Sequence, residues 1–175
     1  MRVFIYNGGL RLVGKSGVGQ AIFHQREMLR RARIETTHHW LQKAGAVHIN
    51  TVLPDSVLAA LAAKLMGRKV IYYGHSTMED FRGSFRGSDK LAPLFRRWIT
   101  FCYGLGDVVL TPTEFSILRI LLENTGNVVS SEDLFHKIWQ DEYYSKSNNT
   151  ITVHIRHLRE KLGDSMDKPR FIKTI

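Results

Sequence analysis

An eight-residue stretch near the start of the chain has the spacing of a phosphate-binding loop. Residues 9–16 read GLRLVGKS, which matches G-x-x-x-x-G-K-[ST], a pattern in which backbone amides and a lysine surround nucleotide phosphates. The four positions between the glycines, 10–13, hold Leu-Arg-Leu-Val, which is bulky for a chain that must curl tightly. The apolar segments at 46–53 and 69–75 do not end in the carboxylate that magnesium-dependent hydrolysis needs. We therefore expect no ATP or GTP hydrolysis from this motif.

Two glycines and a histidine beyond the motif are the candidate ligand residues of the first half. Gly17 and Gly19 stand at the expected start of a helix, where unpaired backbone amides and the helix dipole favour a phosphate group. His75 follows an expected strand. The functional interpretation is a phosphate-binding turn with a histidine nearby. The simpler alternative is that the glycines only permit a tight turn and His75 merely ends a strand.

A helix expected at 148–163 carries the polar side chains best suited to nucleic acid. Its apolar residues repeat at helical spacing and predict one buried face; they are Ile151, Ile155, Leu158 and Leu162. The opposite face presents Asn149, Val153 and His157, with Thr152, Arg156 and Arg159 beside them. Small, hydrogen-bonding and cationic side chains on one exposed helix face suit the major groove of DNA. Any solvated amphipathic helix could show the same periodicity, so the pattern alone leaves both interpretations open.

Residues 1–110 alternate short apolar segments with helical patterns, which predicts a Rossmann-like α/β domain with a parallel sheet covered by helices on both faces. The expected strands and helices follow in turn along the chain: strand 2–6, helix 19–32, strand 46–53, helix 55–67, strand 69–75, helix 91–104 and strand 107–111. Asp55 is the expected cap of the second helix, and Gly67 is its expected end.

Residues 111–175 are dominated by helical patterns and predict a second domain. A first helix is expected to start with a capping box, for which Thr111, Pro112 and Glu114 have the right spacing. Gly126 indicates the end of this helix. A second helix is expected at 130–139 and a third at 148–163, while FIKTI at 171–175 has the pattern of a short strand. We place the domain boundary at 110/111.

The charge of the chain is distributed very unevenly between these two parts. The net charge is +9; residues 1–110 hold 16 Lys and Arg against 7 Asp and Glu, and residues 111–175 hold 9 of each. An anionic partner is therefore expected for the first part, with lipid headgroups, nucleotides and nucleic acids as alternatives. A single cysteine, Cys102, and the lack of a long apolar run favour a cytoplasmic protein without disulfides or a membrane span.

A membrane surface is one specific form of that partner. The candidate basic surface comprises Arg30, Arg31, Arg33, Arg82, Arg86, Arg96 and Arg97, and the aromatics beside it are Phe95, Trp98, Phe101 and Tyr103. Basic residues next to aromatics suit anionic lipid at the inner face of a membrane. The alternative is that the aromatics belong to the core and the arginines to a solvated face.

The first half resembles the N-terminal domain of family 4 glycosyltransferases of the GT-B fold. The similarity begins at KSGVGQAIFHQREML (15–29), continues from AVHINTVLPDSV (46–57) to MEDFR, and ends at GDVVLTPTE (106–114). It is greatest to bacterial enzymes that glucosylate diacylglycerol. The resemblance implies that Gly17 and Gly19 lie against the diphosphate of a donor such as UDP-glucose and that His75 lines the reaction centre. The donor-binding second domain of that family has no counterpart in this sequence, so we expect no transfer.

Residues 110–175 resemble the winged-helix effector domain of OmpR/PhoB-type response regulators, with TVHIRHLREKL (152–162) as the most specific segment. The resemblance implies that the third helix enters the major groove. Val153 and His157 then face bases with Thr152 near them, and the residues at backbone-contacting positions are Thr150, His154, Arg156 and Arg159. The segment at 140–149 corresponds to the loop that touches RNA polymerase. The receiver domain, the sheet before the first helix and the final wing hairpin have no counterpart here.

The sequence therefore predicts an α/β domain at 1–110, followed by a truncated winged-helix domain at 111–175 that binds DNA and regulates transcription, without a cofactor. The alternatives are a glycosyltransferase fragment that binds a nucleotide sugar or a lipid surface, or a chimera whose halves fold without activity. The segment DVVLTPTEFS (107–116) serves both halves and leaves the origin of the join open.

Overall fold

The computed structural model describes residues 2–8, 17–75, 88–140 and 145–175, without the side chains of 145–148. Residues 9–16, which hold the loop motif, lie outside this part, as do Arg82 and Arg86. The chain forms two compact units, Met1–Val109 and Leu110–Ile175. Each is described here by itself, as unit 1 and unit 2.

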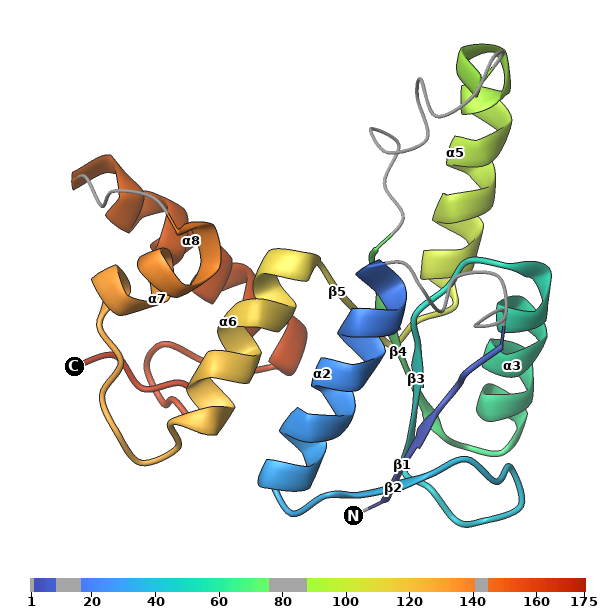
Figure 1. The fold of residues 1–175 in the computed structure, drawn as a ribbon, viewed down its shortest axis with the longest axis horizontal. Helices are drawn as coiled ribbons and strands as arrows, with labels where there is room; N and C mark the ends of the chain where they lie inside the picture. The colour runs from blue at the N-terminus through green and yellow to red at the C-terminus, as the bar shows by residue number, and fades with distance from the viewer. Residues whose placement is uncertain (1, 9–16, 76–87, 141–144) are drawn as a thin grey trace. The chain divides into compact units, whose positions relative to one another are not determined.

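Unit 1 is built on a five-stranded sheet with the order β2-β1-β3-β4-β5 (Figure 1). The strands are β1 (Arg2–Ile5), β2 (Glu35–Thr37), β3 (Ala46–Ile49), β4 (Lys69–Tyr73) and β5 (Val108–Leu110). The pairs β1–β2, β1–β3 and β3–β4 are parallel. The expected strands are confirmed, although each is shorter than its apolar segment.

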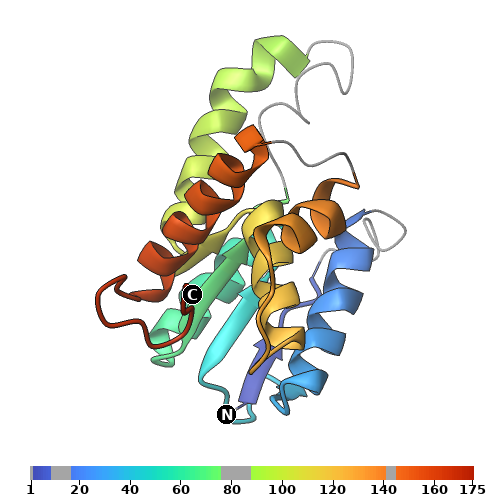
Figure 2. The same cartoon turned by 90° about the vertical axis from the view of Figure 1, so that its left-hand side faces the viewer.

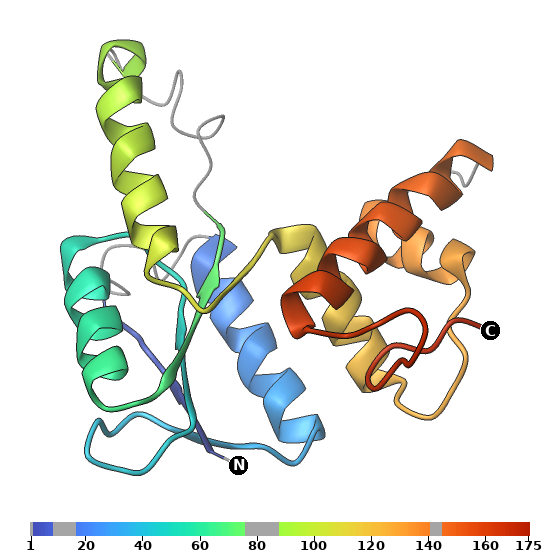
Figure 3. The same cartoon turned by 180° about the vertical axis from the view of Figure 1, so that it is seen from behind.

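The helices of unit 1 cover both faces of the sheet, as expected for this class of fold. They are α2 (Gly17–Arg31), α3 (Pro54–Leu65) and α5 (Ser88–Gly104). Figures 1 and 3 show α2 on one side of the strands and α3 and α5 on the other. The crossover from β1 to β2 runs in the opposite direction along the sheet to that from β3 to β4. Right-handed connections therefore place their helices on opposite faces.

The core between the sheet and α3 is formed by alternate strand residues, because successive side chains point to opposite faces. Phe4, Val47 and Val70 are in register across β1, β3 and β4, and they pack with Ala60 and Ala63 of α3. On α2, the buried apolar residues are Ile22, Met28 and Leu29. This packing fixes the end of β4, which His75 follows.

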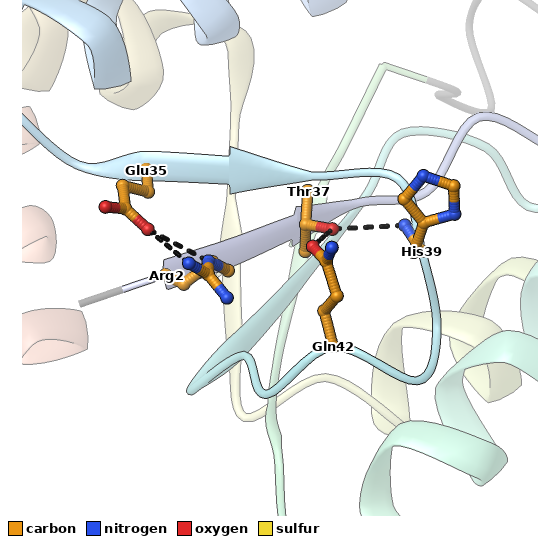
Figure 4. Close-up of polar contacts among 5 residues, drawn as sticks. All are labelled: Arg2, Glu35, Thr37, His39 and Gln42. Carbon is orange, nitrogen blue, oxygen red and sulfur yellow. Dashed lines mark hydrogen bonds and ion pairs between the residues drawn. The ribbon is translucent and has the colours of Figure 1, made fainter.

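The short strand β2 is the element that the sequence did not predict. Its three residues, Glu-Thr-Thr, are polar, and two of them are exposed. Figure 4 shows what holds it: the Arg2 guanidinium pairs with the Glu35 carboxylate at 2.6 Å, beside the Thr37 hydroxyl, which hydrogen-bonds to Gln42. The Thr37 oxygen also accepts the backbone N–H of His39 at 3.1 Å. The strand is thus held by polar partners and not by an apolar pattern of its own.

The start of α3 differs from the expectation. Leu53 is the N-cap residue, Pro54 is the first helical residue, and the cap makes no side-chain hydrogen bond. Asp55 is therefore not the cap: it lies in the first turn and accepts a hydrogen bond from the Tyr6 hydroxyl at 3.0 Å. The expected end is confirmed, since Gly67 has a φ of +67° just after the helix.

Unit 2 contains α6 (Pro112–Glu123), α7 (Ser131–Trp139) and α8 (Ser145–Leu162) (Figure 2). The predicted capping box is confirmed: the Thr111 hydroxyl accepts from the Glu114 backbone N–H, and the Glu114 carboxylate accepts from that of Thr111. Ser130 caps α7 in the same way by accepting from the Asp133 N–H. The three helices meet at Ile120, Leu134 and Ile151, one from each helix.

The prediction of a strand at 171–175 is wrong, because these residues form no strand in the described structure. The reason lies in the backbone amides. The N–H groups of Arg170, Phe171 and Ile172 donate to the Asp164 carboxylate, at 2.7, 3.3 and 3.0 Å. The segment therefore turns back beside the end of α8 (Figure 3).

Candidate nucleic-acid interface

The exposed face of α8 brings together most of the side chains that the sequence assigned to DNA. Asn149, Thr150, Thr152 and His157 are exposed, and Val153 has an exposed fraction of 49%. Val153 and His157 are four residues apart, so they lie one above the other on the helix. This face therefore combines an apolar contact, hydroxyl groups and an imidazole.

The opposite face of α8 fixes its rotation about its own axis. Ile151 and Leu158 are buried, and Ile155 packs partly buried against the cluster formed with α6 and α7. Leu162 is half-buried. Because these positions pack inward, Val153 and His157 face outward.

Arg156 is the cation of this exposed face. Its side chain is 72% exposed, and its Nε lies 3.1 Å from a Glu160 carboxylate oxygen one turn later. An exposed ion pair of this kind is weak, so the guanidinium can exchange its carboxylate partner for a phosphate. Arg156 thus occupies a position that suits a contact with the DNA backbone.

Arg159 corrects the sequence interpretation, which placed it on the same face. It is only 3% exposed, and its guanidinium donates to the Ser165 carbonyl at 3.3 Å and to the Thr174 hydroxyl at 2.8 Å. On the helix surface Arg159 lies next to the buried Leu158, on the side that faces the segment after α8. Arg159 therefore holds that segment in place and does not lie on the exposed face.

His154 also differs from the expected exposed contact. It is half-buried, with its ring 6.1 Å from that of Trp139, and its Nδ1 is buried without a hydrogen-bond partner among the described residues. Burial lowers the pKa of His154, with a smaller opposing effect from Glu114 and smaller supporting ones from His157 and Lys161. His154 thus packs between α7 and α8 and is not an exposed side chain.

An ion pair between Lys161 and the buried carboxylate of Glu114 ties α8 to α6, and it could not be predicted from the sequence. The Lys161 ammonium lies 2.5 Å from the carboxylate of Glu114, which is 2% exposed. Burial opposes ionisation of Glu114, but hydrogen bonds from Lys161 and the Thr111 N–H outweigh it and lower its pKa. The capping-box spacing identified Glu114, whereas no local pattern could reveal a partner 47 positions away. The pair fixes the C-terminal end of α8 against the first turn of α6.

The candidate residues of unit 1 lie at the ends of its elements. Gly17 begins α2, and Gly19 lies in the first turn. His75 follows β4 and is half-buried, with its Nε2 3.2 Å from Asn50 Oδ1. Burial lowers the pKa of His75. The glycines and His75 thus lie where the sequence placed them.

The basic surface predicted for unit 1 is divided among several elements. Arg30 and Arg31 both pair with Glu27, at 2.7 and 2.9 Å, and Arg33 is exposed just after α2. On α5, Arg96 and Arg97 are exposed.

The aromatic residues of α5 divide in the same way. The Trp98 indole donates to the Val52 carbonyl at 2.6 Å, and Tyr103 packs against the core, whereas Phe101 is 51% exposed. The alternative of core aromatics is therefore confirmed for Trp98 and Tyr103, whereas Phe101 is exposed.

In the described part of the chain, no group of three or more His, Cys, Asp and Glu side chains could hold a metal ion. No helix in that part is long and apolar enough to cross a membrane.

Comparison with known proteins shows what unit 2 is similar to. The family described as "Transcriptional regulatory protein, C terminal" matches residues 106–175. The predicted resemblance of residues 110–175 to OmpR/PhoB-type regulators is therefore confirmed.

Two regulatory proteins of enterococci are similar to this chain. The chain is 79% identical over 66 residues to the regulatory protein VanR of Enterococcus faecium, which is 38% of this chain and 29% of VanR. It is 39% identical over 122 residues to the regulatory protein VanRc of Enterococcus gallinarum, which is 70% of this chain and 51% of VanRc.

A relative of the other predicted class is also found. The chain is 33% identical over 153 residues to the processive diacylglycerol alpha-glucosyltransferase of Acholeplasma laidlawii, covering 85% of this chain and 43% of the enzyme. This aligned length exceeds the 110 residues for which the sequence analysis noted the resemblance. The chain spans about half the length, or less, of each of these three relatives.

Proposed function

We propose that the protein binds DNA through α8 of unit 2 and regulates transcription. The observation that carries this proposal is the exposed face formed by Val153, His157 and Thr152, backed by a helix whose other face is packed. A helix held in this way can enter the major groove, where apolar contacts and hydrogen bonds distinguish base pairs. The similarity to VanR over 66 residues supports the same conclusion. We propose a cytoplasmic location, where a protein with this function meets DNA.

The roles of the exposed residues follow from their chemistry. Val153 offers an apolar contact to a thymine methyl group, and His157 and Thr152 offer hydrogen bonds to base edges. Thr150 and Arg156 contact the phosphate backbone and position the helix. Arg159 supports the fold of unit 2 and does not contact DNA.

A titration with two DNA duplexes tests this proposal. One duplex carries the operator of VanR, and the other carries the same bases in scrambled order. We expect tighter binding to the operator, and we expect Val153→Ala together with His157→Ala to remove most of the difference. Equal binding of wild-type protein to both duplexes, or none to either, contradicts the proposal.

We further propose that residues 140–149 contact RNA polymerase. The segment joins α7 to the start of α8, and Gln140 ends α7 with a φ of +54°. Support comes from the resemblance to OmpR/PhoB-type regulators. Cross-linking from a photoreactive residue at Lys146 to polymerase on operator DNA tests the contact.

We propose lipid binding by unit 1 as a second candidate function, and the exposed side chains of α5 favour it. Leu91, Leu94 and Phe101 are 48%, 67% and 51% exposed, next to the exposed Arg96 and Arg97. Apolar side chains beside cations suit an anionic membrane surface. The similarity to the diacylglycerol glucosyltransferase supports lipid binding, with Gly17, Gly19 and His75 as the residues that would meet UDP-glucose. Flotation with anionic vesicles and calorimetric titration of UDP-glucose test the two parts separately.

A further inference from the structure

A pair of buried amide side chains lies next to His75 in unit 1. Gln25 of α2 is fully buried, and Asn50, which follows β3, is 2% exposed. The Gln25 Nε2 donates to Asn50 Oδ1 at 2.6 Å, and the Asn50 Nδ2 donates back to Gln25 Oε1 at 3.0 Å. Because each amide satisfies the other, the Asn50 side chain is held in place by a partner on a different element, with its Oδ1 on the side of His75.

The His75 ring lies against this pair. Its Nε2 is 3.2 Å from Asn50 Oδ1, and the ring stacks on Tyr73, with centroids 6.3 Å apart and planes 12° apart. The backbone N–H of His75 donates to the Tyr73 carbonyl at 2.9 Å. The imidazole is thus held by stacking, by its own backbone and by one side-chain hydrogen bond.

The chemistry of Asn50 decides which ring nitrogen carries the proton. Its Oδ1 is an acceptor only, so the ring nitrogen that it meets must donate. We propose that Asn50, oriented by Gln25, is a positioning residue that holds His75 as the neutral tautomer with its proton on Nε2. Nδ1 is then a hydrogen-bond acceptor. The proposal is independent of DNA binding by unit 2.

The surroundings of His75 agree with a neutral ring. Tyr73 lies beside it on β4, and the Tyr73 hydroxyl pairs with Nδ1 of His48, a buried histidine on β3, at 3.1 Å. Gln25 and Asn50 are uncharged amides. Burial alone lowers the pKa of His75, and no charged group among the described residues contributes to the shift.

The consequence is that His75 offers an acceptor at this edge of the sheet and not a cation. A phosphate group therefore gains no charge-assisted hydrogen bond from this ring at neutral pH. A ligand that meets His75 does so through a donor such as a hydroxyl group. An anionic partner of unit 1 must therefore be attracted by other side chains than His75.

Long-range ¹H–¹⁵N correlation spectra of the imidazole nitrogens test the proposal in the 175-residue chain. In the wild-type protein we expect His75 to show a protonated Nε2 and an unprotonated Nδ1 at neutral pH. This reading needs no substitution, so it stands even where a variant fails to fold. A protonated Nδ1, or a mixture of tautomers, overturns the proposal.

Two further measurements probe the role of Asn50. Asn50→Asp places a carboxylate on Nε2 and should raise the His75 pKa by about 1–3 units. The matched control, Asn7→Asp, puts a carboxylate near His38 instead, since Asn7 Nδ2 lies 3.2 Å from His38 Nδ1, and should leave His75 unchanged. An unchanged His75 pKa in folded Asn50→Asp contradicts the proposed contact. Adding inorganic pyrophosphate should not raise the His75 pKa in the wild-type protein, and a rise overturns the inferred acceptor role.

Discussion

At the scale of single residues, two arginines three positions apart on α8 have different roles. Arg156 is exposed, while Arg159 is buried and donates to Ser165 and Thr174. Helical spacing alone predicts the same role for both, because it places both next to the exposed face. The position of the chain after α8 decides the difference, and that position depends on Asp164. Helical spacing therefore predicted correctly that Val153, His157 and Arg156 are exposed. It could not predict that the segment after α8 buries Arg159.

The two arginines should respond differently to truncation. Arg156→Ala removes one phosphate contact, so binding to operator and scrambled DNA should weaken alike, with the salt slope reduced by about one unit. Arg159→Ala should leave the salt slope of the folded protein unchanged. Titrations at two or more salt concentrations measure both slopes. A reduced slope for Arg159→Ala alone contradicts this assignment.

Arg159→Ala should instead reduce stability. The substitution removes hydrogen bonds from a buried cation, which typically contribute about 1.5–3 kcal/mol each. We expect a lower free energy of unfolding in urea titrations, with Arg156→Ala as the matched control at the exposed position. Equal stability of the two variants argues against a structural role for Arg159.

At the scale of elements, the first turn of α6 stabilises unit 2 through Thr111 and Glu114. The capping box was readable because its residues are three positions apart, whereas the Glu114–Lys161 pair required the fold. The same limit applies to β2, whose polar residues are held by Arg2 and whose apolar pattern is absent. FIKTI shows the converse: a strand pattern forms no strand here, because Asp164 binds the amides at its start.

Removing the cap should have a measurable cost. Thr111→Ala leaves the Glu114 N–H without its hydroxyl acceptor, and loss of such a cap costs about 1 kcal/mol. Thr125→Ala is a control, since the Thr125 hydroxyl is exposed after the helix and donates only to the Leu122 carbonyl. We expect thermal unfolding of unit 2 to shift downward for Thr111→Ala and to change little for the control. The reverse order of the two variants refutes the importance of the cap.

The buried pair should make unit 2 sensitive to acid. Because the folded pKa of Glu114 is lowered, its ionisation stabilises the fold above the unfolded value of about 4.3. This contribution is lost as the pH falls from there through the folded pKa. The stability difference between wild type and Glu114→Gln should therefore be larger at about pH 7 than at about pH 3 in urea titrations. A difference independent of pH contradicts the ion-pair assignment.

At the scale of the whole molecule, composition already separated the two parts, with the net charge confined to 1–110. Strand and helix periodicity predicted the α/β sheet and the helical unit, because both depend on local patterns. What the sequence could not show is the division of the basic surface, since Arg30 and Arg31 are paired with Glu27 while Arg96 and Arg97 are exposed.

Vesicle binding by α5 and DNA binding by α8 should be separable by substitution. Arg96→Gln with Arg97→Gln should weaken binding to anionic vesicles, because the charge of α5 is removed, and raised salt should do the same. The ratio of operator to scrambled DNA binding should not change. Arg30→Gln with Arg31→Gln is the matched control, since these arginines are paired with Glu27. Equal loss of vesicle binding in both double variants rules out α5 as the lipid-binding element.

The central claim is that α8 reads DNA sequence, and one measurement tests it most directly. The 175-residue chain is titrated with operator and scrambled duplexes at two salt concentrations, alongside the variants Val153→Ala and His157→Ala. We expect each substitution to reduce the preference for operator by about 1–3 kcal/mol at one base step, with non-specific binding unchanged. If operator and scrambled DNA bind equally, or if both variants keep the wild-type preference, the assignment of α8 as the recognition helix is wrong.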